Sequence, residues 1–157
     1  MRIRTFVLLS TLATVASLPI WAESGACEAV GGALMTNIGV IGGVYNMGPA
    51  FGDLQGSVAA QILSFNSNGT YTVQHYWVAS SGETILLKPA ILSPTYPVPS
   101  DPKIVAVPWG HYSSAIAGGT GKYAGATGTI NYFGMADFAK NTLVLRYSGT
   151  VCYQPPQ

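Results

Sequence analysis

The sequence predicts an all-β protein, a single small antiparallel eight-stranded β-barrel with eight to ten strands in total. Short runs of β-branched and aromatic residues alternate with turns rich in glycine, asparagine and proline. Apolar residues make up 48% of the chain and charged residues only 8%, so many strand positions must be buried or face a cavity. No stretch shows a convincing helical period. A β-sandwich fits the same strand spacing and stays an alternative.

The N-terminus has the layout of a secretory signal peptide. Arg2 and Arg4 form a basic region, residues 5–18 an apolar region, and residues 20–22 an acceptable cleavage site. We therefore expect residues 1–22 to be a signal peptide, residues 23–157 to be one barrel domain, and the protein to be secreted or periplasmic. We expect no membrane span after cleavage, although an outer-membrane barrel is an architectural alternative for an exported all-β chain.

The charge balance bears on the class of partner. Removing the leader takes away two of the seven basic residues, which leaves five against six acidic ones, without a basic cluster. A chain with this balance lacks the electrostatic attraction on which nonspecific nucleic-acid binding depends, so we expect no nucleic-acid partner.

The two cysteines, Cys27 and Cys152, lie near the two ends of the mature chain. An exported protein meets an oxidising compartment, so we predict a disulfide that ties the first strand to the last. In the chain-entropy model, closing so long a loop stabilises the fold by roughly 4 kcal/mol. We expect no metal at these residues, because neither cysteine has a His or a second Cys nearby.

The strands are expected in the following order. Residues 28–52 are rich in glycine and weakly patterned, with residues 33–38 and 40–45 as candidate strands broken by Gly39, Gly42 and Gly43. The firmest hairpin joins residues 56–65 to residues 70–78 through the turn 66–69, because Asn-Gly accepts positive φ at both positions. Further strands are expected over residues 84–88, 104–107, 111–116, 130–133 and 142–152.

Five prolines fall within residues 89–102, which predicts a long surface loop at one end of the barrel that could cover it as a lid. Glu83, in the turn before it, is expected to be a solvated turn residue.

Residues 115–134 are predicted to form a sharp strand–turn–strand corner. The structural glycines of this corner are Gly118, Gly119, Gly121, Gly125 and Gly128. The segment also fits a loose G-x-G-x-x-G/A pattern, but the dinucleotide fingerprint requires a following helix, and residues 127–133 are rich in β-branched and aromatic residues.

This corner, Ala-Ile-Ala-Gly-Gly-Thr-Gly-Lys-Tyr-Ala-Gly-Ala-Thr-Gly over residues 115–128, resembles the glycine-rich corner of the allene oxide cyclase and dirigent proteins. The resemblance covers roughly residues 111–151. It implies a calycin-like eight-stranded barrel with an apolar cavity, and a structural role for the glycines and Tyr123. The acidic residues that dirigent proteins use have no matching position in this chain.

The candidate ligand-binding residues are chosen for a cavity inside such a barrel. In the strand over residues 70–78, alternation places Tyr71, Val73, His75 and Trp77 on one face. An imidazole among large aromatic side chains suits an apolar pocket with one polar group that fixes the ligand. To these we add Trp109 near a barrel end, Tyr132, and Arg146, the lone charge within the last strand. Each also has a structural explanation, as a core or surface residue. The ligand-binding set is therefore Tyr71, His75, Trp77, Trp109, Tyr132 and Arg146.

We expect the protein to hold a small hydrophobic molecule. The chain shows no Ser-His-Asp order, no His-x-x-x-His spacing and no paired catalytic carboxylates, so catalytic residues are not assigned and no cofactor or metal is expected. Whether it is an enzyme is left open; if it is, the resemblance implies a cofactor-independent isomerase or cyclase. A non-catalytic binder and a structural or partner-binding envelope protein are the alternatives, and assembly into a homo-oligomer is also left open.

Overall fold

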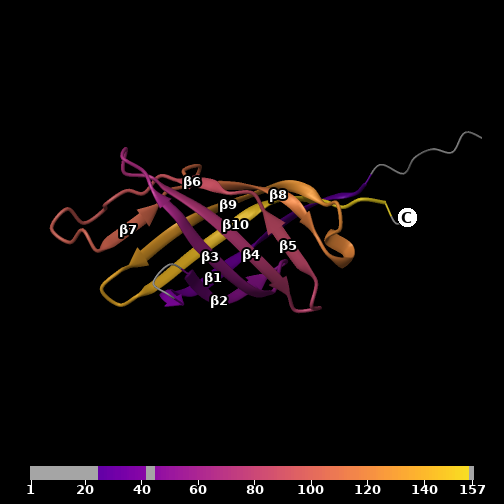
Figure 1. The fold of residues 1–157 in the computed structure, drawn as a ribbon, viewed down its shortest axis with the longest axis horizontal. Coiled ribbons are helices and arrows are strands. Elements are labelled where there is room, and N and C mark those ends of the chain that lie inside the picture. The colour runs from indigo at the N-terminus through magenta and orange to yellow at the C-terminus, as the bar shows by residue number, and fades with distance from the viewer. Residues whose placement is uncertain (1–24, 42–44, 156–157) are drawn as a thin grey trace, which may run out of the picture.

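A computed structural model of the protein describes residues 25–41 and 45–155. These residues form ten strands and one short 3-10 helix (Figure 1). The predicted signal peptide, residues 1–22, lies outside the described residues. The elements are β1 (Cys27–Ile41), β2 (Tyr45–Gly52), β3 (Gly56–Phe65), β4 (Tyr71–Ala79), β5 (Thr84–Leu87), β6 (Ala90–Leu92), β7 (Ile104–Val107), β8 (Ser113–Gly119), η1 (Gly121–Tyr123), β9 (Thr127–Asp137) and β10 (Thr142–Cys152).

Eight of the strands close into an antiparallel barrel, which confirms the predicted fold class. Their order is β10-β1-β2-β3-β4-β5-β8-β9, and the pairing of β9 with β10 closes the ring. Two short strands extend the wall of the barrel. β6 pairs with β4 beyond the end of β5, and β7 pairs with β9 beyond the start of β8. Figure 1 shows β7 at the end of the molecule opposite the C-terminus.

The interior of the barrel is filled from alternate positions of each strand, as the pleat requires. In β4 the residues Val73, His75, Trp77 and Ala79 are buried, whereas Tyr76 is exposed. The residues that alternation places together with His75 therefore form the inward face of this strand, a direction that the sequence alone left open.

One end of the barrel is closed by a plug, which consists of Leu54, Trp77 and Tyr147. Leu54 lies in the turn between β2 and β3 and is buried. The indole N–H of Trp77 donates to the Leu54 carbonyl at 2.8 Å, and the Leu54 N–H donates to the Tyr147 hydroxyl at 2.8 Å. The two rings meet edge to face at 5.2 Å. Both backbone groups of this inserted turn residue are thus satisfied by side chains.

The predicted disulfide is present. Cys27 begins β1 and Cys152 ends β10, and the two residues are directly paired across these antiparallel strands. The bond therefore lies at the seam where the first and last strands of the ring meet.

The first strand differs from the prediction. A strand break was expected at Gly39, but β1 continues through it to Ile41. Gly39 has φ 69°, and the register between β1 and β2 shifts over residues 37–41. The glycine thus forms a β-bulge that bends the strand instead of ending it.

The proline segment was expected to be a loop throughout, yet it contains β6. Pro89 separates β5 from β6, and both strands pair with the same edge of β4, at residues 76–78 and 71–73. The proline interrupts one strand of the wall, which then resumes for three residues.

The glycine corner is a strand–turn–strand corner, as predicted: β8 ends at Gly119, η1 covers three residues, and β9 begins at Thr127. A strand follows the glycines where a dinucleotide site would need a helix. Gly121 shows why glycine is required, because its φ is 56° and a Cβ there would collide with the carboxyl group of Glu83. Glu83 accepts the Lys122 N–H at 2.9 Å and the Ser81 hydroxyl at 2.7 Å, so it anchors the corner and is more than a solvated turn residue.

Candidate ligand pocket

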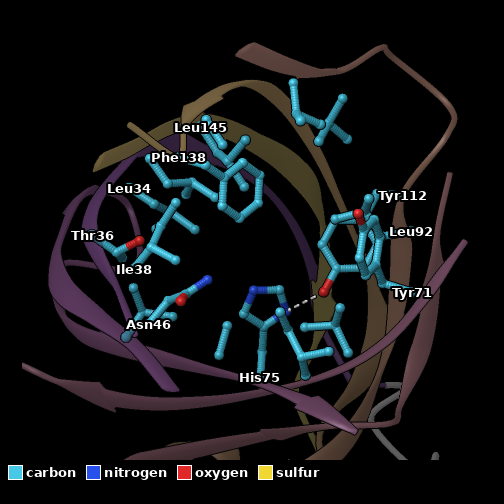
Figure 2. A pocket seen from close by; sticks show the side chains of 18 residues that line it. Leu34, Thr36, Ile38, Asn46, Tyr71, His75, Leu92, Tyr112, Phe138 and Leu145 are labelled. Atoms are coloured by element: carbon cyan, nitrogen blue, oxygen red, sulfur yellow. Dashed lines mark hydrogen bonds between the residues drawn. The ribbon is translucent and has the colours of Figure 1, made fainter. Parts of the chain in front are cut away.

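A pocket lies inside the barrel (Figure 2). It occupies the end opposite the plug, because β4 lines it with Tyr71, Val73 and His75 but not with Trp77. Its cavity volume is about 60 Å³, and its walls come from β1, β2, β3, β4, β6, β7, β9 and β10. Ile38, Tyr71 and Phe138 line it and are themselves partly exposed, so the pocket reaches the surface at this end. The apolar lining residues are Leu34, Ile38, Val58, Ala60, Ile62, Val73, Leu92, Val105, Val107, Ala136, Phe138, Leu143 and Leu145.

Strand register explains why a cavity exists here. Leu34 on β1 pairs with Leu145 on β10, and both side chains point inward. Opposite them, Ala60 on β3 pairs with His75 on β4. A methyl group beside the imidazole fills little of the barrel cross-section, which leaves space above the ring.

Three rings form the base of the pocket, and we call them the aromatic floor: His75, Tyr112 and Tyr132. The His75 ring stacks on Tyr132 with centroids 4.4 Å apart, and Tyr112 lies 5.0 Å from Tyr132. The Tyr112 hydroxyl lies 3.0 Å from Nδ1 of His75. All three side chains are buried. His75 and Tyr112 line the pocket and Tyr132 pairs across the strands with Tyr147 of the plug, so the floor lies between the two.

Burial fixes the protonation state of the floor. It lowers the pKa of His75 from its ordinary 6.5 to about 3, so the imidazole is neutral near pH 7. Burial also raises the pKa of Tyr112 and of Tyr132 above the ordinary phenol value, so both keep their protons. The floor is a set of uncharged polar groups.

Two further polar side chains face the cavity. Thr36 on β1 is buried, and its hydroxyl has no hydrogen-bond partner among the described residues. Asn46 on β2 accepts the Gly39 N–H through Oδ1 at 3.1 Å, which leaves its NH2 group for other partners. Figure 2 shows the hydroxyl of Thr36 and the amide of Asn46 turned toward the same cavity as the His75 ring.

The ligand-binding residues predicted from the sequence divide into three groups: those at the pocket, one in the plug, and two outside the barrel. Tyr71 and His75 line the pocket, and Tyr132 lies in the floor under the imidazole. Trp77 is part of the plug and does not reach the pocket.

Trp109 and Arg146 lie outside the barrel. Trp109 is 60% exposed and makes a T-shaped contact with Phe133, with the ring centroids 4.9 Å apart. Arg146 is exposed because it stands between the inward-facing residues Leu145 and Tyr147. Neither residue lines the pocket.

Thr36, Asn46 and Tyr112 were missed from the sequence. Alternation through residues 33–38 places Leu34, Thr36 and Ile38 on one face and could have indicated Thr36. Tyr112 falls within the expected strand over residues 111–116, where alternation with Ser114 and Ile116 could have indicated it. Asn46 has no such signal, because it follows a glycine-rich stretch.

The pocket lining carries no formal charge: it contains no Asp, Glu, Lys or Arg. Across residues 25–41 and 45–155, no group of three or more His, Cys, Asp or Glu side chains is placed to hold a metal ion. Within the same part of the chain, no helix is long and apolar enough to cross a membrane.

The strand pairing and the pocket together define a class of protein: an eight-stranded antiparallel β-barrel that is plugged at one end and hollow at the other. No protein-family model matches the chain, and no curated protein matches it.

The solved structures that are similar to it include two dirigent proteins. For the pterocarpan synthase dirigent protein GePTS1 the TM-score is 0.37 at 13% identity, over 94% of this chain and 100% of that one. For the pterocarpan synthase dirigent protein PsPTS1 the TM-score is 0.36 at 12% identity, over 85% of this chain and 99% of that one. These TM-scores are too low to establish a common fold, so the barrel assignment rests on the strand pairing of this chain.

Proposed function

We propose that this protein is exported and that its barrel holds a small, mostly apolar molecule in the end pocket. The observation that carries the proposal is the composition of the pocket. Its walls are aliphatic, and its few polar groups, among them the neutral imidazole of His75, converge on one cavity. Specific small-molecule sites commonly have this arrangement, an apolar lining with a few placed polar groups.

The size of the pocket restricts the ligand. A cavity of about 60 Å³ is well below the roughly 300–1,000 Å³ of a site for a drug-sized ligand. It encloses a short chain or part of a ring, and the remainder of a larger molecule must project past Ile38 and Phe138.

The same geometry favours binding over proton-transfer catalysis. A general base works best when its pKa lies near the working pH, and the pKa of His75 is about 3. The imidazole is then a weak base. An isomerase or cyclase acting in this pocket would have to work mainly by holding a reactive conformation of its substrate, because the lining offers no ionised group.

A second candidate function, binding of a protein partner in the cell envelope, is favoured by the outer surface. Met35 on β1 pairs with Val144 on β10, which pairs with Met135 on β9. These neighbouring side chains are 52%, 50% and 48% exposed, so they form an apolar row across three strands.

The test is a binding measurement with a cavity-filling variant. The mature protein, purified with its disulfide intact, is analysed by native mass spectrometry, extracted with solvent and titrated with apolar fluorescent probes. The variant Ala136→Leu fills the pocket, and Met135→Leu is its matched control because the neighbouring side chain points outward. We expect Ala136→Leu to abolish probe binding and Met135→Leu to preserve it. A wild-type protein that extracts bare and binds no probe would refute the proposal and favour the partner-binding function.

A further inference from the structure

We propose that the ligand presents a neutral hydrogen-bond-accepting oxygen, as in a ketone, aldehyde, ester or ether, to His75 Nε2–H and the Thr36 hydroxyl. This inference rests on the proposed function and names the ligand class of that pocket. Three features of the lining lead to it.

The first feature is the absence of compensating charge. The lining contains no Lys, Arg, Asp or Glu, and its one imidazole is neutral. A carboxylate or ammonium group moved from water into this pocket would lose its hydration and gain no counter-charge, which is strongly unfavourable. The polar group of the ligand is therefore uncharged.

The second feature is the tautomer of His75. The Tyr112 hydroxyl lies 3.0 Å from Nδ1. A phenol is a good donor and a poor acceptor, because its oxygen lone pair is delocalised into the ring, whereas an unprotonated imidazole nitrogen is a good acceptor. The Tyr112 O–H therefore donates to Nδ1, and the ring proton sits on Nε2.

Nε2–H then lacks a partner among the residues that the structure describes. The bond with Tyr112 is the only hydrogen bond that the imidazole makes with the described residues. Figure 2 shows the ring extending from β4 into the cavity, with its second nitrogen on the side of Asn46. His75 thus offers a donor to whatever occupies the pocket.

The third feature is that the other cavity-facing groups are also donors. Thr36 is 6% exposed, and its hydroxyl has no partner among the described residues. Asn46 has its oxygen occupied by the Gly39 N–H, so its NH2 group remains. Three donors face one cavity, and a carbonyl oxygen, which has two lone pairs, satisfies two of them.

The experiment compares ligands that share one carbon skeleton: cyclohexane, cyclohexanone, cyclohexanol and cyclohexanecarboxylate. Each competes against an apolar fluorescent probe in the disulfide-intact mature protein. We expect cyclohexanone to bind about tenfold more tightly than cyclohexane, the difference that one hydrogen bond to an otherwise unpaired donor provides. We expect no measurable displacement by the carboxylate.

Two variants test the assigned residues. Thr36→Val keeps the side-chain shape and His75→Phe keeps a ring, and each is expected to lower the preference for cyclohexanone over cyclohexane while cyclohexane still binds. Thr150→Val, an exposed position on β10, is the matched control and should leave the preference unchanged. Nitrogen NMR of the unliganded protein should show the His75 proton on Nε2, a readout that requires no ligand.

The outcomes separate this inference from the proposed function. If no member of the set displaces the probe and the probe itself does not bind, the proposed function fails and this inference fails with it. If cyclohexane and cyclohexanone bind equally, or if the preference survives both variants, the inference alone is overturned. Tighter binding of cyclohexanol or of the carboxylate, or a proton on Nδ1, would also overturn it.

Discussion

The indole of Trp77 and the phenol of Tyr147 hold the same residue, Leu54, from opposite sides of its peptide backbone. Trp77 binds its carbonyl and Tyr147 binds its N–H, each at 2.8 Å. Leu54 is separated from these residues by 23 and 93 positions in the chain. The plug therefore links the β2–β3 turn to β4 and to β10, and its loss should be felt by the whole barrel.

The variant Trp77→Phe tests the plug. It leaves the buried Leu54 carbonyl without a donor and removes part of a packed ring, so we expect the free energy of unfolding to fall by about 2–4 kcal/mol. Urea denaturation monitored by circular dichroism measures the change. Tyr76→Phe, one residue away on the exposed face, is the control and should change stability by less than about 0.5 kcal/mol. Equal effects of the two variants would contradict the role of the plug.

Reduction of the Cys27–Cys152 disulfide tests the seam of the barrel. The bond spans 125 positions, and the chain-entropy model gives a loss of about 4–5 kcal/mol when it is broken. The comparison is denaturant unfolding with and without a thiol reductant. A double variant with alanine at both positions should already be less stable and should not respond to the reductant.

The pH dependence of stability should report the buried imidazole of His75. Its pKa is about 3 in the folded protein and about 6.5 in the unfolded chain, so the unfolded chain binds the proton more readily between these values. Stability is therefore complete above about pH 6.5 and falls as the pH decreases, by about 2 kcal/mol between pH 7.5 and pH 5.

Denaturant unfolding at a series of pH values measures this dependence. His75→Phe should flatten it in that range, while a variant of the exposed His111, His111→Gln, should keep it. A wild-type stability that stays constant from pH 7.5 to pH 5 would show that the imidazole is accessible to water.

The carboxylate of Glu83 should hold the glycine corner in its folded conformation. Its pKa lies below the ordinary value, first because it accepts the Lys122 N–H and then because it accepts the Ser81 hydroxyl. We expect Glu83→Ala to accelerate amide exchange at Lys122, measured by NMR, while Glu28→Ala leaves that rate unchanged. Because the pKa is depressed on folding, the anchor should be fully present above the ordinary pKa of 4.5 and should weaken as the pH falls through the folded value.

Local patterns explain why much of the fold could be predicted from the sequence. Asn68-Gly69 marks a tight hairpin, the corner glycines mark a sharp reversal, and alternation in β4 groups His75 with Val73 and Trp77 on one face. Each of these signals depends only on neighbouring residues. The length of β1 could not be obtained in this way, because whether Gly39 ends a strand or forms a bulge depends on pairing with β2.

The candidate site was harder to predict because a single strand shows neither the direction nor the depth of its side chains in a barrel. Trp77 shares the inward face with His75, but it lies one layer deeper, in the plug. Arg146 lies on the outward face. Whether a strand residue points inward or outward depends on the register of its strand and cannot be obtained from local sequence. Alternation groups Thr36 with Leu34 and Ile38, but only the strand pairing shows that this face lines the same cavity as His75.

The disulfide at the seam closes the described barrel into a covalent ring. One peptide bond between Cys27 and Cys152 can therefore be cleaved while the two parts stay linked. A protease that nicks the exposed hairpin at Asn68 would produce two fragments that Cys27 and Cys152 keep joined. Such a protein would run as one species on a non-reducing gel and as two after reduction. The ends of the described barrel at Cys27 and Cys152 should also tolerate being joined by a linker, with the chain reopened at that hairpin, because these two residues are adjacent partners in the ring of strands.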